Sequence, residues 1–164
     1  MVRSLPDRLE MPLTGPRTLT ALLARAVSTA PDRPALITPS AVMTFREVEL
    51  QSRVLAKAYS ALGVVAGDRV AVWLPNRFEW ILSLLACARL GAAVVAVNTR
   101  FRSVELADIL ERAAPRLLVM APGFRGIDYW NILAGCPNAS LASMRALVTC
   151  GEGVASRDLP NCIP

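Results

Sequence analysis

Three short apolar segments, separated by helical patterns, constrain the fold of this chain most strongly. They read RVAVWL at 69–74, AAVVAV at 92–97 and RLLVM at 116–120. The first is rich in β-branched residues, and the other two lack polar alternation, which is typical of strands covered on both faces of a parallel sheet. Their order, β, α, β, α, β with short connections, predicts right-handed crossovers. We therefore expect an α/β fold with a three-layer, open, mainly parallel sheet and helices on both faces.

Helix boundaries can be predicted from residues that cap helix ends. Thr18 precedes apolar residues at helical spacing and is the expected N-cap of a first helix, after which PALIT and AVMT form a short extended pair. Thr44 and Asn76 are each followed three residues later by Glu, the spacing of a capping box, which predicts helices over 45–62 and 77–90. Each of these two helices ends at a glycine.

The second half of the chain shows weaker signals. Ser103 is the expected N-cap of a helix that Pro115 separates from the RLLVM strand. IDYWNILA predicts a short helix that ends at Gly135, and RALVTC predicts a further strand. We expect a proline-rich lead-in over 1–17, one α/β domain over 18–150 and a divergent tail over 151–164.

The basic residues do not form the stripe that is typical of nucleic-acid binding. The formal net charge is +5, but 17 of the 18 basic residues are arginines scattered along the chain, and Lys57 is the only lysine. The nearest approach to a nucleic-acid motif is Arg100 and Arg102 around Phe101, which also fits a solvated loop before a helix. We expect no nucleic-acid partner.

The cysteines and the apolar runs bear on whether the chain binds a metal and on the compartment in which we expect it. The chain has four cysteines, no histidine and no CxxC motif, so we expect no zinc site. The most apolar run, 80–97, contains Arg89 and Gly91, which argues against a membrane span. No apolar secretory segment precedes it within the first seventeen residues. We expect a reduced, cytoplasmic protein without a transmembrane segment.

Ligands of open α/β sheets bind beyond the carboxyl ends of the strands. In this chain those positions carry the loops PNRF, NTRF and APGFRG. Asn98, Arg100 and Arg102 could contact an anion, or they could serve the backbone of a turn. Gly123 and Gly126 fit neither GxGxxG nor GxxxxGK[ST].

Asp68 precedes a strand and has no second acid at a recognisable spacing, so a turn contact is expected for it. We assign no catalytic, cofactor-binding or metal-binding residue within this chain.

From residue 44 to residue 119 the sequence resembles the N-terminal part of the AMP-forming acyl-CoA synthetases, members of the adenylate-forming superfamily. The resemblance covers roughly 18–120 and extends more weakly to about 150. The matching pieces are TFRE at 44–47, ALG at 61–63, GDRV at 67–70, LPN at 74–76, LGA at 90–92, Asn98 with Arg100, Glu105-Leu106 and Ile109-Leu110.

The resemblance implies an incomplete N-terminal subdomain of the adenylate-forming fold. Full-length family members activate a carboxylic acid with ATP and Mg²⁺ to an acyl-adenylate and transfer the acyl group to coenzyme A. Their phosphate-binding loop, which ends in Pro-Lys-Gly, and their C-terminal domain with its catalytic lysine have no counterpart here, and Lys57 matches neither. We therefore expect no cofactor for this chain, and no activity from it alone.

Two further interpretations remain open. The chain could be a non-catalytic α/β module that binds a partner protein, such as an intact synthetase, at an exposed sheet edge, or that associates with itself. It could also be a small-molecule binding domain with its ligand at the strand ends.

Overall fold

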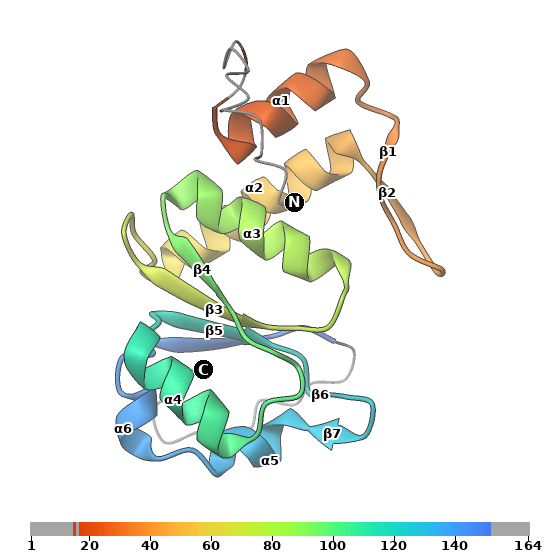
Figure 1. The fold of residues 1–164 in the computed structure, drawn as a ribbon. Helices are drawn as coiled ribbons and strands as arrows, with labels where there is room; N and C mark the ends of the chain where they lie inside the picture. The colour runs from red at the N-terminus through yellow and green to blue at the C-terminus, as the bar shows by residue number, and fades with distance from the viewer. Residues whose placement is uncertain (1–14, 16, 152–164) are drawn as a thin grey trace, which may run out of the picture.

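The computed structural model describes residue 15 and residues 17–151. The expected lead-in, 1–17, and tail, 151–164, therefore lie almost entirely outside the described residues. Figure 1 shows the order of the elements along the chain. The helices are α1 (Leu19–Thr29), α2 (Phe45–Ala61), α3 (Phe78–Leu90), α4 (Ser103–Ala113), α5 (Tyr129–Ala134) and α6 (Asn138–Leu141). The strands are β1 (Pro34–Ile37), β2 (Val42–Thr44), β3 (Arg69–Trp73), β4 (Ala93–Ala96), β5 (Leu117–Met120), β6 (Gly123–Phe124), β7 (Ile127–Asp128) and β8 (Ala146–Thr149).

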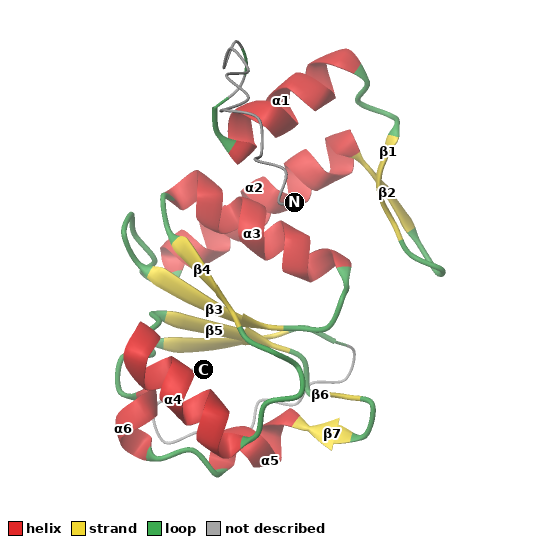
Figure 2. Ribbon diagram, in the orientation of Figure 1, coloured by secondary structure: helices red, strands yellow, loops and turns green. Residues whose placement is uncertain are grey.

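Four strands form the central sheet in the order β4-β3-β5-β8, and all three pairings are parallel (Figure 2). Val72 lies opposite Ala96 on one side and Val119 on the other. The parallel α/β sheet that the three apolar segments predict is confirmed. The strand predicted from RALVTC is also confirmed, since β8 pairs with β5.

Helices cover both faces of the sheet, as expected. In Figure 1, α2 and α3 lie on one side of the strands and α4, α5 and α6 on the other. Alternate residues of β3 contribute to the two cores: Val70 and Val72 pack against Ala56 and Tyr59 of α2, whereas Trp73 packs with Leu106 and others on the far face. This alternation follows from the two-residue period of a strand, and it explains why β3 and β5 carry apolar residues at nearly every position.

The expectation that AAVVAV is covered on both faces is wrong. Ala93 and Ala96 are exposed, and Val94 and Val95 are only half-buried. The reason is position, because β4 pairs with β3 alone among the described strands and forms an edge of the sheet. A continuous apolar run indicates a strand but does not distinguish an edge from a centre.

The two earlier caps form as predicted. The Thr18 side chain accepts a hydrogen bond from the Ala21 backbone N–H, 3.1 Å. Thr44 accepts from the Glu47 N–H at 3.3 Å while the Glu47 carboxylate accepts from the Thr44 N–H at 2.7 Å, which completes a capping box. These contacts fix where α1 and α2 begin.

The two later caps differ from expectation. Arg77, not Asn76, occupies the N-cap position of α3, and its side chain makes no capping bond. Arg102, not Ser103, occupies the N-cap position of α4; Ser103 is the first residue of the helix, and its hydroxyl donates to the distant Ile132 carbonyl at 2.8 Å. Glu105 instead accepts from the Arg102 N–H at 3.0 Å. A contact with a residue distant in sequence thus engages the Ser103 side chain, which local spacing assigns to a helix end.

Small elements complete the fold. The β1–β2 hairpin confirms the extended pair, and the helix predicted from IDYWNILA forms as α5 with Asp128 as its N-cap. The β6–β7 hairpin and α6 go beyond the sequence-based expectation, since APGFRG indicates only a turn.

The apolar helix α3 has 13 residues, and none of the helices in the described part of the chain has the length and apolarity that a bilayer crossing requires.

Candidate functional site

The carboxyl ends of the four parallel strands meet at one edge of the sheet, where open α/β folds bind ligands. The segments that leave this edge begin at Leu74, Val97, Ala121 and Cys150. They include all three loops that the sequence singles out, so the structure brings those loops to one side of the molecule.

An aromatic pair holds the loop after β4 in place. Trp73 and Tyr129, both fully buried, stack with ring centroids 3.9 Å apart and an interplanar angle of 10°. The Trp73 indole N–H donates to the Asn98 carbonyl at 3.1 Å, and the Tyr129 hydroxyl donates to the Thr99 carbonyl at 3.1 Å. Burial raises the pKa of the Tyr129 hydroxyl, which keeps it a hydrogen-bond donor at neutral pH.

The polar side chains of that loop make hydrogen bonds to the loop's own backbone. The Asn98 side-chain oxygen accepts from the Arg100 backbone N–H at 2.9 Å, and an Arg102 guanidinium nitrogen donates to the Arg100 carbonyl at 3.2 Å. Asn98, Arg100 and Arg102 are all exposed. Of the two interpretations open for these residues, their contacts favour the turn.

Arg77 links the loop after β3 to the end of β8. Its guanidinium donates to both carboxylate oxygens of Glu79, at 2.8 and 2.6 Å, and to the Cys150 carbonyl at 3.2 Å. Burial alone would raise the pKa of the Glu79 carboxyl, but the hydrogen bonds from Arg77 outweigh it and hold that pKa below its usual value. Glu79 therefore neutralises the charge of Arg77, whereas Arg100, Arg102 and Arg125 at the same edge form no ion pair among the described residues. Sequence reasoning missed Arg77, although an Arg two residues before a Glu at a helix start is a detectable signal.

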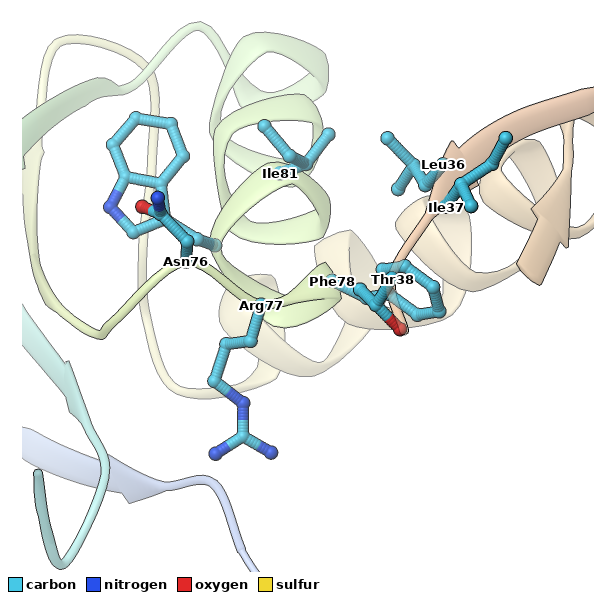
Figure 3. A pocket seen from close by; sticks show the side chains of 8 residues that line it. Leu36, Ile37, Thr38, Asn76, Arg77, Phe78 and Ile81 are labelled. Carbon is cyan, nitrogen blue, oxygen red and sulfur yellow. The ribbon is translucent and has the colours of Figure 1, made fainter. Parts of the chain in front are cut away.

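A small pocket of about 220 Å³ lies between the β1–β2 hairpin and the start of α3. It is lined by Leu36, Ile37, Thr38, Asn76, Arg77, Phe78, Trp80 and Ile81. Figure 3 shows the Arg77 side chain extending away from Leu36, Ile37 and Ile81. The Thr38 hydroxyl donates to the Ala41 carbonyl at 3.1 Å, so the pocket offers mainly apolar walls and the exposed Asn76 amide.

A larger apolar groove of about 460 Å³ runs beside α2. Its lining residues are Leu50, Gln51, Val54, Leu55, Ala58, Tyr59, Glu79, Leu82, Ser83 and Cys150. At its floor the Tyr59 and Ser83 hydroxyls are 2.9 Å apart, and the Ser83 hydroxyl donates to the Glu79 carbonyl at 2.6 Å. Leu50 and Val54 are 62% and 61% exposed, which is unusual for large apolar side chains near a groove.

The remaining candidates have local structural roles. The Asp68 carboxylate accepts from the Val65 backbone N–H at 2.9 Å, which is the expected turn contact. Gly123 lies in β6, where a Cβ would approach the Ile127 carbonyl oxygen to 2.4 Å, and Gly126 has a φ of +77° in the hairpin turn. Both glycines are required by the hairpin rather than by a bound phosphate.

The described residues hold no group of three or more His, Cys, Asp or Glu side chains that could bind a metal ion. Cys87, Cys136 and Cys150 are free thiols, and burial raises their pKa, to about 11 for Cys87. Such thiols are weak nucleophiles at neutral pH. Cys162 lies outside the described residues. Lys57, on α2, is exposed.

Comparison with known proteins identifies the family. The model of the family described as AMP-binding enzyme matches residues 23–156. A 3-[(3aS,4S,7aS)-7a-methyl-1,5-dioxo-octahydro-1H-inden-4-yl]propanoyl:CoA ligase of Mycobacterium tuberculosis is 41% identical over 132 residues, which are 80% of this chain and 25% of that protein. The human mitochondrial medium-chain acyl-CoA ligase ACSF2 is 29% identical over 134 residues, 80% of this chain and 22% of that protein. The chain thus spans about a quarter of the length of these curated relatives.

Solved structures agree with the sequence matches. An acetoacetyl-CoA synthetase from Streptomyces lividans superposes with a TM-score of 0.76 and 29% identity, over 85% of this chain and 23% of that one. The anthranilate CoA ligase AuaEII, solved in complex with anthranoyl-AMP, superposes with a TM-score of 0.74 and 26% identity, over 83% of this chain and 25% of that one. On the extent of the family match and the shared fold, this chain belongs to the AMP-binding enzyme family.

Proposed function

We propose that this chain is the N-terminal section of an ATP-dependent carboxylate–CoA ligase. The observation that carries the proposal is the collinear match: four-fifths of the chain aligns with about a quarter of a CoA ligase at 41% identity. The full-length enzyme would join a carboxylic acid to AMP, with release of pyrophosphate, and would then transfer the acyl group to the thiol of coenzyme A. ATP, Mg²⁺ and coenzyme A are the cofactors of that complete reaction.

The residues present here do not fit a triphosphate. Binding ATP requires concentrated positive charge and free backbone donors. At the carboxyl edge the Arg77 guanidinium is paired with Glu79 and the Arg100 N–H already donates to Asn98, although the exposed Arg100, Arg102 and Arg125 form no ion pair among the described residues. The sequence contains no Pro-Lys-Gly loop, and its single lysine lies on α2. We therefore propose that the chain has no ligase activity by itself, and we derive no catalytic step through ATP.

The acid that the full-length enzyme would activate belongs to a broad class. The names of the relatives range from a fused-ring propanoate to medium-chain acyl groups. The Figure 3 pocket has apolar walls and a volume of about 220 Å³, and we assign it no role in the choice of acid. A carboxylic acid with an apolar body is the substrate class that we propose.

The inactivity is tested by ATP–pyrophosphate exchange. Purified chain is incubated with ATP, Mg²⁺, labelled pyrophosphate and a panel of medium-chain, aromatic and fused-ring carboxylic acids, and the full-length Mycobacterium tuberculosis relative serves as the positive control. We expect exchange only from the control. Acid-dependent exchange from this chain above the no-enzyme background would refute the proposal that it is inactive alone.

One observation favours a second function, a non-catalytic module that binds a partner protein or a second copy of itself. Leu50 and Val54 expose large apolar side chains on one face of α2, which is typical of protein interfaces. Sedimentation of the purified chain distinguishes self-association from binding of a different protein, because only self-association raises the mass of the chain as its concentration rises.

We propose the cytoplasm as its location, where free thiols such as Cys150 stay reduced.

A further inference from the structure

The amino edge of the central sheet, opposite the edge with the candidate loops, carries three arginines on neighbouring strands. Arg69 begins β3, Arg116 directly precedes β5 and Arg145 directly precedes β8. The Arg116 N–H donates to the Arg69 carbonyl at 2.8 Å, and the Arg145 N–H donates to the Arg116 carbonyl at 2.9 Å. The three residues therefore continue the register of the parallel strands by one position. We call them the arginine row.

The arginine row concentrates positive charge that the rest of the described chain does not neutralise. Neighbouring strands lie about 4.8 Å apart, and like charges at matching positions of such strands are destabilising. None of the three arginines forms an ion pair with a described residue. The acid next to the row in sequence, Asp68, accepts a hydrogen bond from the Val65 backbone N–H instead. The row is therefore a charged feature that packing within the described chain does not explain.

The hydrogen-bonding capacity of the row is used only in part. The Arg69 Nε–H donates to the carbonyl of Ala113, the last residue of α4. The Arg116 guanidinium lies near Gly63, just after α2, where an added Cβ would come within 3.8 Å of the Arg116 Nη2. The Arg116 Nε is buried and has no hydrogen-bond partner among the described residues. A buried donor without an acceptor is costly, and it favours an acceptor that binds there.

A phosphate group has the chemistry that the row requires. Its oxygens accept from several guanidinium groups at once, and its negative charge offsets the repulsion between neighbouring arginines. Arg69 and Arg145 are exposed, so an anion reaches the row from solvent. We propose that the arginine row is a binding site for a phosphate group. The site lies at the opposite edge of the sheet from the candidate loops, and it goes beyond the proposed ligase function.

The phosphate group has two sources, a free anion such as pyrophosphate or the headgroup of an anionic lipid. Leu62 and Val65, in the turn between α2 and β3, are 40% and 61% exposed. Exposed apolar side chains close to arginines in sequence and fold are typical of surfaces that lie on anionic membranes. A free anion needs the arginines alone. The two sources therefore differ in whether Val65 takes part.

Titration calorimetry tests the free anion. The purified chain is titrated with pyrophosphate at fixed ionic strength, and thermal melts are recorded with and without it. If the free anion is the source, the melting temperature should rise by roughly 3 °C or more at ten times the dissociation constant. Arg116→Gln and Arg145→Gln should each weaken binding by about tenfold, because each removes a charge-assisted hydrogen bond. Arg145 is exposed, so its variant tests the site even if Arg116→Gln lowers stability.

Arg33→Gln is the matched control for both sources. Arg33 is exposed, precedes β1 outside the central sheet and also forms no ion pair with a described residue. Co-sedimentation with vesicles of phosphatidylglycerol, and of phosphatidylcholine as the neutral lipid, tests the headgroup. If the headgroup is the source, the chain should bind only the anionic vesicles, and Arg145→Gln should weaken that binding about fivefold. Val65→Ser should weaken vesicle binding too, and should leave pyrophosphate binding unchanged.

Three results overturn the proposal. The first is that neither pyrophosphate nor the anionic vesicles bind. The second is that Arg33→Gln weakens binding as much as Arg145→Gln, which would assign binding to the net charge of +5. The third is that binding survives Arg116→Gln and Arg145→Gln, which would place the anion elsewhere. No readout involves ligase activity, so this proposal can fail while the proposed function stands.

Discussion

The indole of Trp73, at the end of β3, lies nearly parallel to the ring of Tyr129, at the start of α5, with centroids 3.9 Å apart. Both rings are fully buried, and each uses its one polar hydrogen to hold a carbonyl of the loop after β4. One aromatic pair thus joins a strand, a helix and the loop between two other elements.

This pair should respond differently to two substitutions. Tyr129→Phe keeps the stack but removes the hydrogen bond to the Thr99 carbonyl, and should lower the free energy of unfolding by about 1 kcal/mol. Trp73→Leu removes the stack, leaves a cavity and should cost about 3–5 kcal/mol. Urea unfolding followed by circular dichroism measures both. Equal losses would contradict the view that packing dominates here.

The capping box of α2 makes a separate contribution. Thr44→Ala removes the side chain that accepts from the Glu47 N–H, and should lower the free energy of unfolding by about 1 kcal/mol. Ser60→Ala, at an exposed position of the same helix, is the control and should be neutral or slightly stabilising. A Thr44→Ala variant as stable as the wild type would show that α2 does not need its cap.

Two glycines of positive φ separate backbone strain from packing. Gly67 has a φ of +87°, and a Cβ added there would meet nothing within 4 Å, whereas at Gly91, with a φ of +71°, a Cβ would lie 3.2 Å from the Ala66 Cβ. Gly67→Ala should therefore cost about 1 kcal/mol from the backbone alone. Gly91→Ala should cost clearly more, because Ala66 must also move. The order of the two melting temperatures checks this, and the reverse order would refute it.

Acid should destabilise the fold through the contact between α2 and α3. Burial would raise the pKa of Glu49, but its hydrogen bonds with Arg53 and Arg89 leave that pKa below its ordinary value of 4.5. A carboxyl whose pKa is lower in the folded state adds stability above its unfolded pKa, and that stability is lost as pH falls through the folded pKa. The melting temperature should therefore fall as the pH drops below about 4.5.

Glu49→Gln tests the source of that effect. The variant should be less stable at pH 7, because Arg89, whose side chain is 16% exposed, loses its charged partner. The melting temperature of the variant should fall less between pH 7 and pH 3 than that of the wild type. If the melting temperatures of the variant and of the wild type fell by the same amount between pH 7 and pH 3, the acid sensitivity would come from other carboxylates, such as Glu79.

Much of the fold is predictable from the sequence because local signals and burial agree. Thr18 and Thr44 cap helices where their spacing indicates, and β3 and β5 are apolar because helices cover both of their faces. The edge position of β4 is not encoded in its own residues, since it depends on which strands pair. Ser103 likewise does not cap α4, because it is the first residue of the helix itself, and its hydroxyl donates to the carbonyl of Ile132, distant in sequence.

The exposed apolar side of α2 and the contacts of Arg77 are harder to predict, because they too depend on elements distant in sequence. Leu50 and Val54 have helical spacing, but so do the core residues of α2, and the sequence does not say which side is covered. The ion pair of Arg77 with Glu79 is local and detectable. Its second contact, with the Cys150 carbonyl, depends on β8 taking its place in the sheet.

The order β4-β3-β5-β8 also bears on how the chain can fold as it leaves the ribosome. Every strand of this sheet after β3 finds a hydrogen-bonding neighbour already synthesised: β4 and β5 flank β3, and β8 joins β5. Parallel sheets generally form slowly because their contacts are distant in sequence. Here the sheet can instead be assembled in the order of translation, one strand at a time, without an early strand waiting for a partner from far downstream.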